Sequence, residues 1–184
     1  MRLFFALPLP ETLKQALAAL QAERRGQGLV ASWPRPEGMH LTLAYLGERP
    51  EAAWPPLQAL GARVAARHAP FPLRTACLGG FPSPSAARVL WLGLEAEPRL
   101  EALAADLTAA LEGAGFPREV RPFRPHVTLA RPRRPGPVDL RGAPPPLAFP
   151  AEALGLFASL PDGPGPAVYR TLGLGRLTAP PGAP

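Results

Sequence analysis

Apolar and polar positions follow two different periods along this chain, and the two periods predict helices interleaved with strands. Leucines recur at helical spacing, with polar residues between them, in 11–25, and similar stretches occupy 56–67 and the segment after Pro98. The last stretch ends at Gly113 and Gly115, because glycine permits a left-handed helix cap. Short apolar runs bounded by glycine or proline predict strands. These runs are 1–7, 29–33, 39–46, 71–78, 88–94, 126–131, 152–159 and 167–174.

The order of these elements favours an α+β fold over a doubly wound parallel sheet, because hairpins alternate with single helices. No glycine-rich loop follows a strand and opens a helix, so the sequence gives no support for a nucleotide-binding loop of that kind. A chain of 184 residues, 47% of them apolar, fits one domain or two small lobes that share a core. We expect a single domain over 1–177 and a mobile tail over 178–184. The segment 132–150, which holds seven prolines, is predicted to be a loop.

Composition adds a basic charge and excludes a secreted protein built on a disulfide framework. The formal net charge is +6, and Lys14 is the only basic residue that is not arginine. Arginine pairs bidentately with phosphate, but charge alone does not separate a phosphate-binding surface from a bias in coding composition. Arg133 and Arg134, for example, either grip RNA or solvate a proline-rich loop. The lone cysteine, Cys77, excludes an internal disulfide and is expected to be buried. No apolar run is long enough to span a membrane, so we expect a soluble cytoplasmic protein.

One short pattern occurs twice, at residues 40–44 (HLTLA) and 126–130 (HVTLA). Both copies lie in predicted strands, where side chains alternate between two faces. In each copy the histidine and the threonine therefore share one face, and the apolar residues between them point to the core. The repeat predicts that each half of the chain contributes one copy to a shared cleft, related by a pseudo-two-fold axis.

These residue types together suit a negatively charged phosphodiester. Near neutral pH one histidine can accept a proton while the other donates one. The hydroxyls of Thr42 and Thr128 can donate to phosphoryl oxygens, and an arginine can neutralise their charge. Alternation places Arg124 on the histidine face, although Pro125 weakens this inference. Arg131 is expected to point the other way unless the strand bends.

Other hydrolytic chemistries fit poorly. A zinc site needs three or four ligands in register, but the sequence has no H-x-x-x-H or C-x-x-C pair. The third histidine, His68, is expected at the end of a helix, where it would interact with the helix dipole. A serine hydrolase is also disfavoured, because no G-x-S-x-G occurs and Ser83 and Ser85 lie in a proline-rich turn.

The two motifs, with segments 2–8 (RLFFALP), 122–131 (PFRPHVTLAR) and 156–160 (LFASL) and with Tyr169, resemble a known family. It is the bacterial and archaeal 2'-5' RNA ligase family, also called RNA 2',3'-cyclic phosphodiesterases, within the 2H phosphoesterase superfamily. The resemblance implies a bilobal α+β fold. Two pseudo-symmetric lobes, each an antiparallel sheet with outer helices, would flank an active-site groove.

The resemblance also implies a reaction and roles for individual residues. Members hydrolyse the 2',3'-cyclic phosphate at an RNA 3' end to a 2'-phosphate, without metal or cofactor. His40 would donate a proton to the leaving 3' oxygen, and His126 would accept one from the attacking water. Thr42 and Thr128 would hold the phosphoryl oxygens.

Two alternatives remain open at this stage. The protein could grip a terminal RNA phosphate without turning it over, as an RNA end-binding protein. As an enzyme it could also run the reverse reaction, joining a 5'-hydroxyl to a cyclic phosphate, as a minor activity. The expected partner is RNA with 2',3'-cyclic phosphate ends, tRNA fragments included, and the expected state is a monomer away from membranes.

Overall fold

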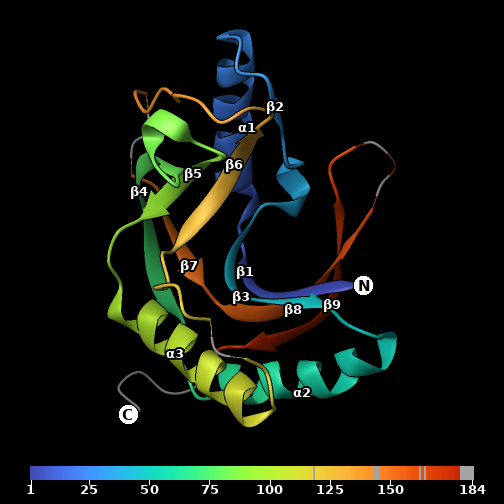
Figure 1. Cartoon of the computed structure of the whole chain (residues 1–184). Helices are drawn as coiled ribbons and strands as arrows, with labels where there is room; N and C mark the ends of the chain where they lie inside the picture. Colours follow the sequence, from blue (N-terminus) through green and yellow to red (C-terminus); the bar gives the residue numbers. More distant parts are fainter. Residues whose placement is uncertain (118, 143–145, 162, 164, 179–184) are drawn as a thin grey trace.

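The computed structural model describes residues 1–117, 119–142, 146–161, 163 and 165–178. Within these residues the strands form one curved antiparallel sheet in the order β7-β4-β5-β6-β3-β1-β8-β9, with β2 paired to β6 (Figure 1). The strands are β1 Arg2–Pro8, β2 Ala31–Ser32, β3 His40–Glu48, β4 Phe71–Phe81, β5 Val89–Leu94, β6 His126–Pro132, β7 Ala148–Ala151, β8 Ala153–Leu160 and β9 Val168–Arg176. The helices are α1 Glu11–Gly26, α2 Trp54–Ala65 and α3 Pro98–Gly113, with short 3-10 turns η1 Pro36–Gly38, η2 Glu51–Ala53 and η3 Pro84–Ala86.

The sheet consists of two halves that meet where β3 pairs with β6. The first half-sheet is β3-β1-β8-β9, and the second half-sheet is β7-β4-β5-β6. Between them, β3 and β6 run antiparallel and pair at Leu41 and Val127. This arrangement confirms the α+β class and the two halves, and it brings the repeated motifs side by side.

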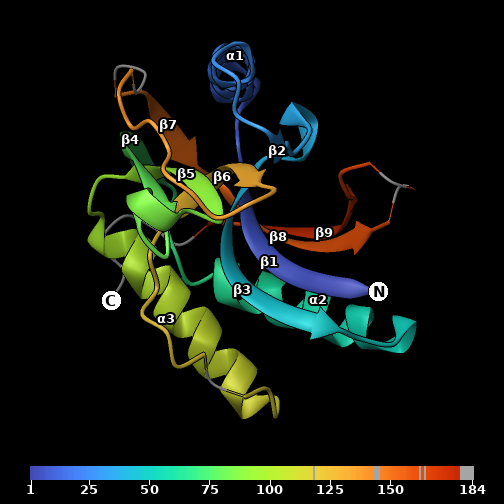
Figure 2. The ribbon, with the colours of Figure 1, turned by 45° about the horizontal axis from the view of Figure 1, so that its top comes forward.

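The helices bury the leucine faces that their spacing predicted. The buried side chains are Leu13, Leu17 and Leu20 of α1, Leu57, Leu60 and Val64 of α2, and Leu100, Leu103, Leu107 and Leu111 of α3. Helices α2 and α3 lie together on one side of the sheet, whereas α1 lies beside β6 (Figures 1 and 2). Helix α2 packs against β8 and β9. It also lies close to β1, because a Cβ on Gly61 of α2 would lie 2.5 Å from the ring of Phe5 of β1. The first half-sheet therefore has a helix-covered face and an opposite face that α2 leaves open.

Two sequence expectations about strands were wrong. The predicted strand 29–33 shrinks to Ala31–Ser32, and the predicted loop 132–150 contains strand β7, which pairs with β4. His68 lies beyond the end of α2 and its Nε2 hydrogen-bonds Asp106 of α3 at 2.9 Å, so it joins two helices. The expected tail 178–184 falls outside the described residues except at Thr178.

Cys77 is exposed, not buried as expected. The register between β4 and β5 explains the difference: Thr75 pairs with Leu94, but Leu78 pairs with Leu92. Strand β4 thus carries one extra residue, and such a bulge shifts the alternation of faces. Leu78 takes the buried place that strict alternation assigns to Cys77. In the described part of the chain, no helix is long and apolar enough to cross a membrane.

Candidate active site

The two repeated motifs place their histidines and threonines on one face of the sheet. Leu41 and Val127 are buried in the main core, and the flanking histidines and threonines are half-buried. On β1, Phe5 packs under α2, whereas its neighbour Phe4 stacks on the ring of His40. His40 therefore lies on the face opposite to α2.

The pairing of Leu41 with Val127 also fixes how the two motifs are oriented. Because β3 and β6 run antiparallel, His40 lies on the side of Leu41 that faces Thr128. By the same relation Thr42 lies toward His126. Each histidine thus lies opposite the threonine of the other motif, as a pseudo-two-fold axis through this pair requires.

Both imidazoles are held by the same hydrogen bond. Nδ1 of His40 donates to the carbonyl of Gly38 at 2.7 Å, and Nδ1 of His126 donates to the carbonyl of Arg124 at 2.7 Å. In each case the acceptor lies two residues before the histidine. A neutral imidazole with its proton on Nδ1 has an acceptor at Nε2, and the protonated ring has a donor there. The two Nε2 atoms are therefore the groups that can exchange a proton with a substrate.

Aromatic rings surround His40. The ring of Phe4 stacks on the imidazole with centroids 4.5 Å apart, and the ring of Tyr169 meets it edge-on at 4.9 Å. Phe157 lies beside both rings, with its centroid 5.5 Å from that of Phe4 and 6.2 Å from that of His40. A Cβ on Gly38 would lie 2.6 Å from Cδ2 of Tyr169, so the ring can approach only because residue 38 has no side chain. Gly38 thus supplies both the carbonyl that orients His40 and the space for Tyr169.

His126 has a corresponding aromatic surround. The ring of Phe81 meets the imidazole edge-on at 5.0 Å, and the indole of Trp91 lies 6.1 Å away. Glycine again makes room, because a Cβ on Gly79 would lie 2.1 Å from the Trp91 ring. In both halves of the sheet, therefore, a histidine is hydrogen-bonded through Nδ1 and flanked by aromatic rings.

Burial and a nearby cation act on both histidines. Burial is the largest influence and lowers the pKa of His40, and the positive charges of Arg131 and His126 lower it further. The hydrogen bond to the Gly38 carbonyl partly offsets this effect. Burial likewise lowers the pKa of His126, the bond to the Arg124 carbonyl opposes it, and the charge of Arg131 adds to it. Arg131 thus acts on both rings.

A bulge in β6 explains how Arg131 reaches the histidines. Leu90 of β5 pairs with Ala130, but the next residue, Trp91, pairs with Thr128, so Leu129 is an extra residue in β6. Leu129 and Ala130 are both buried in the core, and the alternation of faces resumes one residue later. The strand therefore bends in the way that the sequence expectation for Arg131 required.

Arg124 and the threonines complete the set of expected site residues. Strand β6 begins at His126, so Arg124 precedes it, and the carbonyl of Arg124 accepts the hydrogen bond from Nδ1 of His126. Its side chain is exposed. Thr42 and Thr128 are half-buried, and no protein hydrogen bond to their hydroxyls is found within the described residues.

The sequence reasoning missed the aromatic rings as parts of the site. Phe4, Phe157 and Tyr169 entered only through the family resemblance, and Phe81 was not considered. Alternation could have found Phe4, because it leaves Phe5 for the helix-covered face. Within the described ranges, no three or more His, Cys, Asp or Glu side chains gather in a way that could hold a metal ion.

Comparisons with known proteins agree with this geometry. A family model described as the 2'-5' RNA ligase superfamily matches residues 8–160. An RNA 2',3'-cyclic phosphodiesterase of Thermus thermophilus is 41% identical over 145 residues, covering 74% of this chain and 71% of that protein. One of Geobacillus stearothermophilus is 38% identical over 128 residues, covering 70% of this chain and 41% of that protein. The chain thus matches less than half the length of the second relative.

Solved structures extend the likeness over nearly the whole chain. The crystal structure of TT0787 of Thermus thermophilus has a TM-score of 0.80 and 37% identity, covering 96% of this chain and 98% of that one. Escherichia coli LigT complexed with 3'-AMP has a TM-score of 0.78 and 28% identity, covering 97% and 98%.

Proposed function

Because the chain belongs to the 2'-5' RNA ligase superfamily, we propose that it is an RNA 2',3'-cyclic phosphodiesterase that works by two-histidine acid–base catalysis. The observation that carries this proposal is the pair of imidazoles on one face of the sheet, each bonded through Nδ1, so that Nε2 is the nitrogen that exchanges protons. The protein is an enzyme of the hydrolase class, and RNA is its partner. LigT, a structural relative, binds 3'-AMP, a nucleotide with a phosphate at the ribose 3' position.

The reaction assigns a different proton to each histidine. Neutral His126 accepts a proton at Nε2 from a water molecule as the water oxygen bonds to phosphorus. Protonated His40 donates its Nε2 proton to the ribose 3' oxygen as the bond between phosphorus and that oxygen breaks. The products are a 3'-hydroxyl and a 2'-phosphate. Each histidine ends in the protonation state of the other, and exchange with solvent resets the pair.

The remaining expected residues hold the phosphoryl group. The hydroxyls of Thr42 and Thr128 donate to the non-bridging oxygens, whose negative charge grows in the transition state. The guanidinium of Arg131 adds a positive charge on the same face. Arg124 contributes through its exposed side chain and through its carbonyl, which orients His126. The chemistry needs no metal. The histidines move the protons, and the threonine hydroxyls and the arginines bind the negatively charged phosphoryl oxygens.

The finer points of the function are also part of the proposal. The substrates are RNA fragments with a 2',3'-cyclic phosphate end, those of tRNA included, and the enzyme works in the cytoplasm. Residues 1–177 act as one catalytic domain. A monomer suffices, since both motifs come from one chain and pair with each other. Ligation is the minor reverse reaction, in which a 5'-hydroxyl must be positioned where water otherwise attacks.

The deciding experiment is incubation with a 2',3'-cyclic nucleotide in the presence of EDTA, followed by identification of the product. We expect a nucleoside 2'-phosphate from the wild type and none from H40A/H126A. A 3'-phosphate product would contradict the proton assignments, and loss of activity in EDTA that a divalent ion restores would contradict the metal-free mechanism. Tight binding of the RNA end without turnover would establish the end-binding alternative instead.

A further inference from the structure

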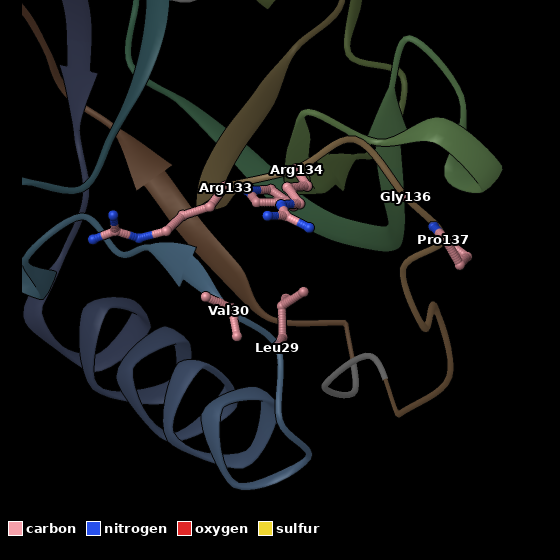
Figure 3. A pocket seen from close by; sticks show the side chains of 7 residues that line it. Leu29, Val30, Arg133, Arg134, Gly136 and Pro137 are labelled. Atoms are coloured by element: carbon pink, nitrogen blue, oxygen red, sulfur yellow. The ribbon is translucent and has the colours of Figure 1, made fainter.

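A pocket lies beyond the end of β6, away from the histidines. Its volume is about 540 Å³, within the range of roughly 300–1,000 Å³ that small-molecule sites occupy. Arg133 and Arg134 lie on one side of it, and Leu29 and Val30 lie on the other (Figure 3). The loop continues along the wall of the pocket through Gly136 and Pro137. The pocket thus combines two cations with an apolar surface.

The backbone that carries these residues is fixed on both sides. The amide of Arg133 donates to the carbonyl of Val30 at 3.1 Å. Gly136 forms an isolated bridge with Ala87, whose amide donates to the Gly136 carbonyl at 2.8 Å. Val138 then donates to the carbonyl of Pro84 at 3.0 Å. The pocket is therefore formed before any ligand arrives, which reduces the entropy cost of binding.

The charges of Arg133 and Arg134 are available to a ligand. Both side chains are exposed, and neither has a carboxylate partner among the residues that the structure describes. The acidic residue of the same loop, Asp139, is already engaged by Arg24 at 3.6 Å and by Arg141 at 3.0 Å. A guanidinium group without a counter-charge attracts a phosphate and can bind it through bidentate hydrogen bonds. The Arg133 and Arg134 side chains point in different directions, so each can bind a phosphate of its own (Figure 3).

Strand β6 connects the histidine face to the pocket, because it begins at His126 and ends at Pro132, which lines the pocket. Ala31 pairs with Pro132, and the bond between Arg133 and Val30 extends that pairing by one residue. Arg133 follows two residues after Arg131, whose charge acts on both histidines. From Thr128 to Arg133 the chain spans at most about 16 Å, at a rise of about 3.3 Å per residue. A few nucleotides of single-stranded RNA can span this length.

We propose that Arg133 and Arg134 form a second phosphate subsite, in which each arginine contacts the RNA backbone a few nucleotides upstream of the cyclic end. This inference rests on the proposed function and extends it to the choice of substrate. Leu29 and Val30, which is 69% exposed, offer an apolar surface to a base or ribose of the same segment. Single-stranded RNA is recognised by this combination of backbone cations and flat contacts to unstacked bases. The enzyme therefore prefers an oligonucleotide over a cyclic mononucleotide.

The test compares R133A/R134A with the wild type on two substrates, a 2',3'-cyclic mononucleotide and a short oligoribonucleotide that ends in the same cyclic nucleotide. We expect the KM for the oligonucleotide to rise on the order of tenfold with kcat unchanged, because charged hydrogen bonds are lost. Kinetics on the mononucleotide should not change. The salt dependence of oligonucleotide binding should also weaken, since fewer counterions are released.

The matched control is R63A/R176A, which removes two exposed arginines from α2 and β9 and leaves the net charge the same as in R133A/R134A. We expect it to behave as the wild type on both substrates. The subsite is refuted if R133A/R134A leaves the oligonucleotide KM unchanged, if the KM for both substrates rises equally, or if the control has the same effect. Thermal unfolding of each variant checks that the fold is intact.

A binding measurement separates failure of the subsite from failure of the proposed function. Fluorescence anisotropy with a 3'-phosphorylated oligoribonucleotide and with a nucleoside 3'-monophosphate needs no turnover. Weaker oligonucleotide binding by R133A/R134A supports the subsite even if the wild type hydrolyses neither cyclic substrate, a result that would refute the proposed function alone. Equal binding by the wild type and R133A/R134A refutes the subsite whether or not the enzyme is active.

Discussion

The side-chain amide of Gln21 donates a 2.8 Å hydrogen bond to the carbonyl of Leu129, the extra residue at the bulge of β6. The same amide nitrogen donates to the carbonyl of Pro34 at 3.0 Å. Gln21 is 2% exposed, so these bonds lie in the core. Helix α1 therefore supports the bend through which Arg131 approaches the histidines.

Replacing Gln21 with Met should destabilise the protein by about 1–3 kcal/mol, because it leaves buried carbonyls without a donor. Urea unfolding gives the difference in the free energy of unfolding. The control is Gln15→Met on the exposed face of the same helix, which should change little. If the bulge relaxes as well, Arg131 moves away from the histidines. The pH profile of activity should then shift to higher pH, because the Arg131 charge lowers both histidine pKa values. A purely structural role would leave that profile in place.

His40→Ala and His126→Ala should each lower kcat by on the order of 10²- to 10⁴-fold, the usual contribution of a positioned acid or base. A substrate with a better leaving group than a ribose hydroxyl needs little protonation. It should restore activity to His40→Ala but not to His126→Ala, as steady-state kinetics on both substrates would show. Rescue of His126→Ala instead would exchange the two roles. Rescue of neither folded variant would favour the end-binding alternative.

The profile of kcat/KM against pH should be bell-shaped, with its maximum below pH ~6.5, the ordinary pKa of histidine. Both histidine pKa values are lowered, chiefly by burial. The acid limb reports protonation of the base, and the alkaline limb reports loss of the proton from the acid. The apparent pKa values of both limbs should therefore lie below the ordinary histidine pKa in the free enzyme. A plateau that extends above neutral pH would contradict this assignment.

Replacing Arg131 with Gln should move both limbs of that profile to higher pH. The arginine charge lowers the pKa of His40 and of His126, so its removal raises both values. The KM should rise as well, because a charged contact to the phosphate is lost. Arg131→Lys is the matched control, since it keeps the charge and should keep the position of the profile. A profile unmoved in Arg131→Gln would place the guanidinium outside the site.

Replacing Gly38 with Ala should lower both stability and activity. The new Cβ would lie 2.6 Å from the Tyr169 ring, and overpacking of this kind costs about 1–3 kcal/mol. The added Tyr169→Ala change removes the clash, so the double mutant should lose less than the sum of the single changes. Gly113→Ala, where nothing lies within 4 Å of the new Cβ, is the control. Additive losses would mean that the clash does not determine the effect of Gly38→Ala.

Local pattern predicted the features that depend on one segment, and long-range packing decided the rest. The shared face of His40 and Thr42 follows from alternation within a single strand, and the leucines of α3 follow from helical spacing. The exposure of Cys77 depends on a bulge that only the pairing of β4 with β5 defines. The contact of Tyr169 with His40 joins residues far apart in the sequence. Neither the bulge beside Cys77 nor the contact of Tyr169 with His40 produces a periodic pattern in the sequence from which it could be predicted.

The order of the strands has a consequence for synthesis on the ribosome. The second half-sheet comes from the continuous stretch 71–151, but β1 of the first pairs both with β3 and with β8, which begins only at Ala153. Because a growing chain folds in units as it emerges, the edge of β1 that pairs with β8 stays unpaired until β8 has been synthesised. His40 is translated before His126, yet its surroundings are finished later. A nascent chain that stops before Phe157 and Tyr169 carries both motifs but lacks two of the aromatic rings around His40.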